Sequence, residues 1–342
     1  SMSSIPETIA QSGTTRSAEA FFGYNNVIDY ILGITFEIWE QGQVEKILDY
    51  YADEIDVYTM EGLSHGAASM VKGTHAMLNA FPDRLLLGDG IIWSGNLSRG
   101  FSSHRIISPM TNRGETAFAP ATDKRIVAMN IADCEITNGQ ITREWLFRDN
   151  VSVLGQLGLD PIQAARTIAK RVDPAHRSWL KQEFDRVRGG KTRSATIGMK
   201  DTDPFTEMAE EVIESLWTGA NHELQQSCYA AYAVLNRAPV RIHSGRDAVI
   251  EHYAEWRTAL PDARIAIDHV CSQPFDENGH HVAVRWSVAG HQEGPMSGLA
   301  ATGKPVYLVG CTHWRILNGV ILKEWTVFDE VGLASQVLDP HN

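Results

Sequence analysis

The chain has 342 residues, of which 43% are hydrophobic and 21% charged, a composition typical of globular proteins. Its formal net charge of -12 argues against nucleic-acid binding. No uncharged apolar run approaches the roughly 20 residues that a membrane helix needs, and the first residues lack the basic start and apolar run of a signal peptide. We therefore expect a soluble, cytoplasmic protein of two domains, with no nucleic-acid or membrane partner.

The predicted elements begin after a tail, residues 1–20, that we expect to be flexible. Apolar residues at helical spacing predict helices over 25–41 and 43–51, a short strand over 55–60 and a third helix over 67–80. Beyond Pro82 come four strands, in RLLLGDGIIWSG, GFSSHRIISPM, RIVAMNIADCEIT and QITREWLFRD. The pair Asn138–Gly139 predicts a two-residue hairpin turn, since both positions of such a turn adopt positive φ. Helices followed by an antiparallel meander indicate an α+β domain with helices on one face of a curved sheet.

This whole order of elements occurs twice. ITNGQITREWLFRD returns 180 residues later as ILNGVILKEWTVFD, identical at seven of fourteen positions. PATDK is matched by AATGK and FPDRLLL by LPDARIA. Such self-similarity predicts duplicated domains, residues 21–160 and 205–342. The segment between them, 161–204, is basic and predicts two helices, each opened by a proline, followed by a flexible linker.

Four cysteines complete the inventory of groups that commonly bind metals or react. They show no CxxC pair and no metal-like spacing with histidine, so we expect buried thiols and no metal site. They are Cys134, Cys228, Cys271 and Cys311.

The repeated pattern resembles a known family. A glycine sixteen residues before Pro-Asp, VAVRWSVAGHQEG, LAATGKPV and NGVILKEWTVFDEVGL resemble SnoaL-like polyketide cyclases of the nuclear-transport-factor-2-like superfamily. The resemblance covers most of both copies, although the first diverges in RIISPMTNRGETAF. It implies two conical α+β barrels, each a curved antiparallel sheet wrapped on helices around an apolar pocket, and chemistry without metal or coenzyme. Because family members pair through their sheets, we expect the two copies to form an internal pseudo-dimer, with further homo-oligomers left open.

Two aligned aspartates are the first catalytic candidates. Asp149 and Asp329 end the repeated segment on the same strand face as Trp145 and Trp325. Beside such apolar neighbours, desolvation would raise the pKa of an Asp toward the range useful for acid–base catalysis. The alternative is that each Asp only caps the helix that follows.

Basic residues in the strands are the next candidates. His104 and His313 lie in predicted strands and suit proton transfer near neutral pH. Arg105 and Arg285 are expected to stabilise a substrate anion or, alternatively, to pair with Asp149 and Asp329, since an unpaired buried charge is costly. Five aromatic residues are expected to help bind the substrate: Tyr58, Trp93, Trp145, Trp286 and Trp325.

One departure from the family concerns the last strand. Many relatives have Trp-Asp in this strand, where this chain has Leu146 and Thr326 after the Trp. Glu144 and Glu324, directly before the Trp, could supply a carboxylate on the opposite strand face. We expect a cofactor-independent lyase, isomerase or aldol-type cyclase acting on a small, apolar, oxygenated molecule. A ligand-binding or scaffold protein is the alternative, an epoxide-type hydrolase is the third, and the active copy is left open.

Overall fold

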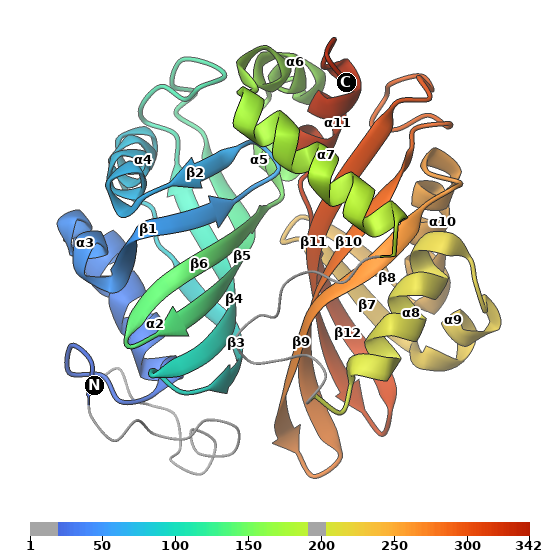
Figure 1. The fold of residues 1–342 in the computed structure, drawn as a ribbon, viewed down its shortest axis with the longest axis horizontal. Coiled ribbons are helices and arrows are strands. Elements are labelled where there is room, and N and C mark those ends of the chain that lie inside the picture. Colours follow the sequence, from blue (N-terminus) through green and yellow to red (C-terminus); the bar gives the residue numbers. More distant parts are fainter. Residues whose placement is uncertain (1–19, 191–202) are drawn as a thin grey trace.

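The structure is a computed structural model that describes residues 20–190 and 203–342. The expected flexible tail therefore lies outside the described residues except for Ala20, as does the expected linker except for its last two positions. The described chain contains two curved six-stranded sheets with their helices, which confirms the predicted α+β class (Figure 1).

The first half begins with helices and ends with a meander of long strands. Its elements are α2 (Val27–Thr35), the π-helical turn η1 (Phe36–Glu40), the 3-10 turn η2 (Val44–Lys46), α3 (Ile47–Tyr50), β1 (Tyr51–Tyr58), β2 (Leu63–His65), α4 (Ala67–Ala80), β3 (Leu87–Gly95), β4 (Arg99–Thr111), β5 (Arg125–Thr137) and β6 (Gln140–Arg148). The sheet order is β2-β1-β6-β5-β4-β3. The prediction of an antiparallel sheet holds for β3 to β6 but is wrong for β1, which runs parallel to β6. The chain leaves α3 at the end of the sheet where β6 begins, so the sheet is mixed.

The second half repeats this plan. Its elements are α8 (Thr206–Thr218), α9 (Glu223–Cys228), β7 (Tyr229–Ala238), β8 (Arg241–Ser244), α10 (Arg246–Ala259), β9 (Arg264–Asp276), β10 (Gly279–His291), β11 (Pro305–Leu317), β12 (Val320–Val327) and α11 (Glu330–Leu338). The sheet order, β8-β7-β12-β11-β10-β9, is that of the first sheet. Both predicted hairpin turns are present, with positive φ at Asn138–Gly139 and Asn318–Gly319.

Three helices connect the halves: α5 (Asn150–Leu157), α6 (Pro161–Arg171) and α7 (Pro174–Arg188). As predicted, α6 and α7 each begin at a proline, and Asp160 and Asp173 cap them. Helix α7 packs on β9, β10 and β11 of the second sheet. In Figure 1 it crosses the front of the molecule between the two sheets.

The two sheets turn one face to their own helices and the other toward each other. In Figure 1 the helices α2 to α4 lie at the left and α8 to α10 at the right, with the sheets between them. A shared hydrophobic cluster joins β5 and β6 to β11, β12 and α7; it includes Ile131, Trp145, Phe147, Val187, Tyr307 and Val327. Each sheet is curved but open, with β2 and β3, or β8 and β9, as its edges, so neither closes into a barrel.

Candidate active site

A cavity of about 440 Å³ lies inside the first domain. Its walls come from α2, η1 and α4 on the helical side and from β4, β5 and β6 on the sheet side. The lining is mainly apolar, including Ile31, Ile34, Ile38, Val57, Met70 and Ile106. Exposed positions on α4, Ser69 and Gly73, also belong to the wall, so the cavity reaches the surface beside this helix. Its volume falls in the range of small-molecule sites.

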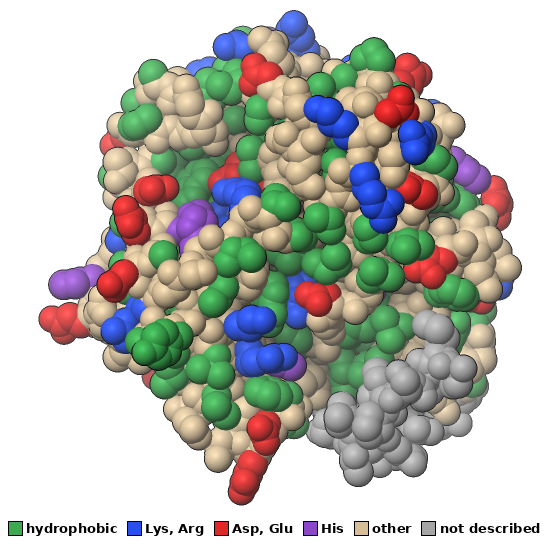
Figure 2. All heavy atoms as spheres, turned by 180° about the vertical axis from the view of Figure 1, so that it is seen from behind, with side chains coloured by type: hydrophobic (Ala, Val, Ile, Leu, Met, Phe, Trp, Pro, Cys, Tyr) green, Lys and Arg blue, Asp and Glu red, His purple; other side chains and the backbone are tan. Residues whose placement is uncertain are grey.

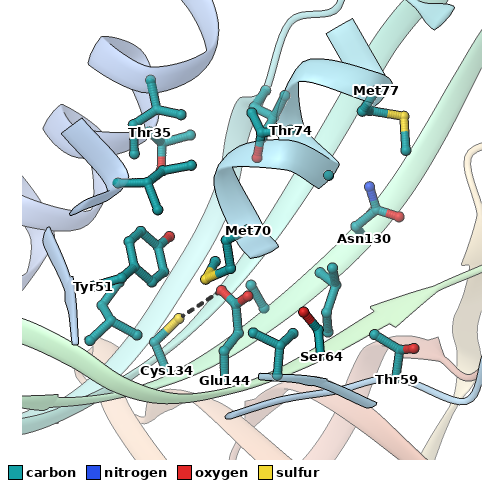
Figure 3. A pocket seen from close by; sticks show the side chains of 18 of the residues that line it. Thr35, Tyr51, Thr59, Ser64, Met70, Thr74, Met77, Asn130, Cys134 and Glu144 are labelled. Atoms are coloured by element: carbon teal, nitrogen blue, oxygen red, sulfur yellow. Dashed lines mark hydrogen bonds between the residues drawn. The ribbon is translucent and has the colours of Figure 1, made fainter. Parts of the chain in front are cut away.

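A carboxylate enters this cavity from β6. Glu144 is 7% exposed, and the Cys134 thiol donates to its Oε1 at 3.3 Å. Burial raises the pKa of the Glu144 carboxyl and keeps the pKa of the Cys134 thiol well above its usual value, so the sulfur retains its proton. Figure 3 shows the pair on the sheet, with Tyr51 and Met70 close by. Among the described residues, that thiol is the one hydrogen-bond donor to this carboxylate.

Two neutral hydrogen-bonding groups share the cavity with Glu144. Tyr51, at the start of β1, lines it, and burial together with the charge of Glu144 holds the pKa of its hydroxyl well above 10. His104 on β4 also lines it; burial and the charge of Arg105 lower its pKa to about 4, so its imidazole is neutral at pH 7. The His104 Nε2 atom has no hydrogen-bond partner in the described part of the chain. Two strand spacings and an offset of two residues along the strand separate His104 from Glu144 by roughly 12 Å, which leaves room for a ligand between them.

In the second domain large aromatic side chains stand at the aligned positions. Thr74, Met77, Ile106, Cys134 and Arg148 line the first cavity. Their counterparts, 179 or 180 residues later, are Tyr253, Trp256, Trp286, Trp314 and Phe328. These five belong to one buried cluster, where Phe328 contacts the rings of Trp256 and Trp286 with centroids 5.2 and 5.7 Å apart. The interior of the second domain is therefore occupied by its own side chains.

The counterpart of Glu144 is held in place by hydrogen bonds. Glu324 is 1% exposed and accepts from the hydroxyls of Tyr229 (2.5 Å) and Tyr253. It also accepts from Trp314 Nε1 at 2.7 Å and Thr326 Oγ1 at 2.8 Å. Four donors on one carboxylate leave little capacity for another partner. Glu324 is thus held by hydrogen bonds within its domain, whereas the aligned Glu144 can still accept hydrogen bonds from a ligand in the cavity.

The aligned arginines lie between the two sheets and make reciprocal contacts. The Cζ of Arg105 is 3.7 Å from the ring centroid of Trp325, and that of Arg285 is 3.5 Å from Trp145. Each arginine therefore stacks on the tryptophan of the other copy: Arg105 on Trp325, and its aligned counterpart Arg285 on Trp145. The contacts between the two sheets are therefore reciprocal at these positions.

Polar contacts in this interface follow the same rule. Arg285 donates to Asp133 Oδ2 at 3.0 Å, and Arg105 donates to Nδ1 of His313, the residue aligned with Asp133, at 2.9 Å. Since a guanidinium only donates, His313 Nδ1 accepts and its Nε2 donates to Ser103 Oγ at 2.7 Å. The expected pairing of the arginines with Asp149 and Asp329 is wrong. Arg105 pairs with Asp89 on the neighbouring strand at 2.7 Å, because register places β3 beside it.

Asp149 and Asp329 act as helix caps, as the alternative interpretation predicts. Asp149 Oδ1 accepts from Ser152 N at 3.2 Å, and Asp329 Oδ1 accepts from Val331 N and Gly332 N at 3.0 Å. Both also contact the other domain: Arg241 donates to Asp149 Oδ2 at 3.1 Å and Asn150 donates to Asp329 Oδ2 at 2.8 Å.

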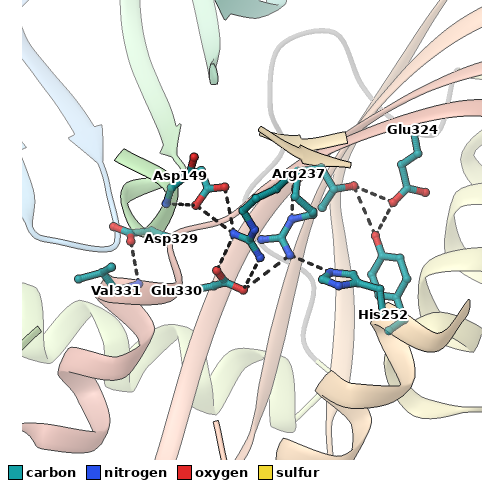
Figure 4. Close-up of polar contacts among 11 residues, drawn as sticks. Asp149, Arg237, His252, Glu324, Asp329, Glu330 and Val331 are labelled. Carbon is teal, nitrogen blue, oxygen red and sulfur yellow. Dashed lines mark hydrogen bonds and ion pairs between the residues drawn. The ribbon is translucent and has the colours of Figure 1, made fainter. Parts of the chain in front are cut away.

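These caps belong to a longer polar chain. Arg241 also donates to Glu330, Glu330 lies 3.7 Å from Arg237, and Arg237 contacts His252 Nε2 at 2.8 Å. Figure 4 shows this chain running from Asp149 to His252. Neither aspartate lines the cavity of the first domain.

The two caps predict an unusual dependence of stability on pH. Burial raises the pKa of Asp149 to about 6, and burial with the charge of Glu61 raises that of Asp329 to about 8. An acid whose pKa is higher in the folded state favours folding when protonated, so the unfolding free energy falls as pH rises from about 4 through the folded pKa. In urea unfolding from pH 4 to 9, the unfolding free energy of Asp329→Asn minus that of wild type should increase with pH up to about pH 8. For Asp149→Asn the gain should stop near pH 6, and a pH-independent difference in both would contradict the assignment.

The five aromatic residues expected to bind substrate lie elsewhere. Tyr58 stacks on Trp145 with ring centroids 5.4 Å apart, in the cluster between the sheets. The ring of Trp325 stacks against the guanidinium of Arg105. Trp93 and Trp286 lie in the cores of their own domains. Of the first-choice catalytic and substrate-binding candidates, His104 alone lines the cavity. Glu144, which the sequence offered as a carboxylate on the strand face opposite Trp145, also lines it, whereas Tyr51 was expected only to pack in the core.

Four further features of the described chain concern metal ions, membranes, thiols and surface charge. No group of three or more His, Cys, Asp or Glu side chains in residues 20–190 and 203–342 is arranged to hold a metal ion. Within the same ranges, no helix is both long and apolar enough to cross a membrane. All four cysteines are buried and unbridged. The face drawn in Figure 2 carries interspersed acidic and basic side chains.

Fold and cavity define an α+β protein of the nuclear-transport-factor-2-like kind, built twice in one chain. Residues 207–337 match the SnoaL-like polyketide cyclase family. The second domain therefore belongs to this family. Since the first repeats its strand order and register, the chain is a tandem duplication of the SnoaL-like domain, as the sequence predicts.

Solved structures similar to this chain each span about one domain of it. A putative SnoaL-like polyketide cyclase from Jannaschia sp. CCS1 is 16% identical, with 41% of this chain and 98% of that chain covered and a TM-score of 0.35. Wild-type IdmH, a putative polyketide cyclase from Streptomyces antibioticus, is 21% identical, with 38% and 97% covered and a TM-score of 0.34. AclR, a putative hydroxylase from Streptomyces galilaeus, is 22% identical, with 38% and 78% covered and a TM-score of 0.34. Comparison with curated proteins finds no match.

Proposed function

We propose that the first domain is a cofactor-independent acid–base enzyme, a lyase, isomerase or aldol-type cyclase, acting on a small apolar molecule with a carbonyl group. One observation carries this proposal. Glu144 is buried in a cavity with a single thiol donor, whereas its counterpart Glu324 is fixed by four donors. A carboxylate with unused acceptor capacity and a raised pKa suits proton transfer near neutral pH.

In the proposed reaction the Glu144 carboxylate removes a proton from a carbon next to the carbonyl group. The C–H electron pair becomes the C=C bond of an enolate, whose oxygen carries the negative charge. Tyr51 and His104 are two neutral groups in the cavity that can donate a hydrogen bond to this oxygen. Glu144 then returns the proton to another carbon, which completes an isomerisation. In an aldol closure the enolate carbon instead bonds to a second carbonyl carbon, whose oxygen takes the proton.

The second domain suits the alternative role of a scaffold. Its interior is filled by aromatic side chains, and its outer sheet face makes reciprocal contacts with the first domain. These contacts support the proposal of an internal pseudo-dimer. Among the catalytic residues suggested by the sequence, the proposal keeps His104 and replaces Asp149 and Asp329 by Glu144. Epoxide-type hydrolysis remains a third proposal, in which Glu144 would activate a water molecule.

The proposal can be tested by transplanting the filled interior into the first domain. The double variant Thr74→Tyr/Cys134→Trp introduces the residues aligned at 253 and 314, which both donate to Glu324. We expect it to fold at least as stably as wild type and to lose the cavity. Deuterium incorporation into 2-tetralone, followed by NMR in D₂O, should be accelerated by wild type and not by the variant. Equal acceleration by both proteins would contradict the proposal.

A further inference from the structure

One end of the cavity contains a buried cation without an acidic partner. Arg84, in the loop after α4, is 6% exposed and lines the cavity. In the described ranges it forms no ion pair, and its Nε has no hydrogen-bond partner. Its guanidinium lies 4.9 Å from the ring centroid of Trp39. With the Asn130 amide turned to donate to Met129 O, the Asn130 oxygen accepts from Arg84 Nη2 at 3.2 Å. An isolated buried charge is costly, so its retention calls for a partner.

A second arginine approaches the same end. Arg148, the last residue of β6, lines the cavity, and its Nε also lacks a hydrogen-bond partner in the described chain. Its nearest carboxylate, Glu61, is 4.0 Å away and also accepts from Asn150 at 2.5 Å. This end of the cavity thus has two guanidinium groups but one carboxylate, Glu61, which lies beside Arg148, and the balance of charge is positive. Burial and the neighbouring charge of Arg148 lower the pKa of Arg84 to about 9, so it is still charged at pH 7.

The fold itself does not require these polar residues. Arg84 aligns with Ala263, Asn130 with Gly310 and Arg148 with Phe328 in the second domain. The second domain forms the same sheet with the same register without any of the three polar side chains. The two arginines therefore occur in the domain that has the cavity and are not needed to form the sheet that both domains share.

We propose that Arg84 and Arg148 bind a carboxylate group of the substrate. A planar guanidinium matches a carboxylate with two parallel hydrogen bonds, and both free Nε atoms belong to such a fork. This inference rests on the proposed function, because it names the substrate class of the same cavity. Arg148 follows Glu144 by four residues on β6, so roughly 13 Å separates their Cα atoms. The substrate is thus an elongated apolar acid whose carboxylate and reacting carbon lie at opposite ends.

The probe for this site is 6-phenylhexanoate, compared by calorimetric titration with the isosteric neutral 6-phenylhexanamide. Wild type should bind the acid at least about tenfold more tightly than the amide. Arg84→Met should reduce this preference to near one, and Arg84→Lys should retain part of it. Because Arg84→Met also removes an unpaired buried charge, its melting temperature should rise, which separates lost recognition from lost folding. The control Arg125→Met, at an arginine whose side chain is 67% exposed, should keep the preference.

Other outcomes overturn the inference. Equal affinity for acid and amide in wild type, or an undiminished preference in Arg84→Met, contradicts carboxylate binding by Arg84. Stabilisation by inorganic phosphate that depends on Arg84, with no binding of 6-phenylhexanoate, shows that the site takes a small inorganic anion. Glu144→Gln separates the two proposals, since it should keep the preference for the acid. If deuterium exchange also survives in that variant, the assignment of Glu144 fails and the anion site stands.

Discussion

Replacing Glu144 with Gln is expected to lower the rate of deuterium exchange by about 10²–10⁴-fold, the usual contribution of a general base. The amide keeps the size of the side chain but cannot take up a proton. Since Glu144 is a buried carboxylate with a single thiol donor, its neutral replacement should leave the melting temperature unchanged or raise it. NMR exchange rates and a thermal unfolding curve of the same preparation test both parts.

The matched control is Glu324→Gln, the same change at the aligned position. Glu324 accepts from Tyr229 and Trp314 on one oxygen and from Tyr253 and Thr326 on the other, and the NH₂ group of Gln, which replaces one of these oxygens, cannot accept from its two donors. We expect this variant to lose about 1–3 kcal/mol of unfolding free energy or more, and to keep its exchange rate while folded. Two variants with the same phenotype would refute the division of roles between the two carboxylates.

Replacing Asp133 with Ala is expected to cost about 3–5 kcal/mol of unfolding free energy, since it leaves the charge of Arg285 buried and unpaired. The two side chains are 2% and 1% exposed and join at 3.0 Å between the sheets. Chemical denaturation measures the loss. Removing both charges in Asp133→Ala/Arg285→Met should recover much of it.

The aligned arginine provides the comparison. Arg105 pairs with Asp89 at 2.7 Å, but the Asp89 side chain is 41% exposed. Asp89→Ala should therefore cost below about 1 kcal/mol. If Asp89→Ala and Asp133→Ala destabilise equally, burial of the interface pair does not set its contribution.

Sequence periodicity predicted the fold well because its signals are local. The helix at Ala67–Ala80 and both Asn-Gly turns depend on nearby residues, and the 180-residue repeat revealed the duplication. The parallel pairing of β1 with β6 was missed, because it joins residues about 90 positions apart and leaves no local pattern.

The site was harder to predict because aligned polar residues have two possible explanations. Arg105 and Arg285, with Asp133 and His313, recur in both copies because each copy presents the same face to the other. Polar residues at aligned positions of the two copies therefore indicated the interface between the sheets and not the cavity. The cavity is marked by differences between the copies, such as Cys134 against Trp314, and their meaning depends on which face of the strand is enclosed.

Fusion of the two domains has a consequence for how the protein can evolve. A homodimer must place every substitution in both subunits, so a change that opens a cavity weakens both cores at once. Here the aromatic interior around Trp286 and Trp314 is encoded separately and stays packed whatever happens in the first domain. The first domain can therefore accept new polar groups while a permanently attached, rigid neighbour supports its sheet. Mutational tolerance should be greatest around the cavity and lowest in the second core.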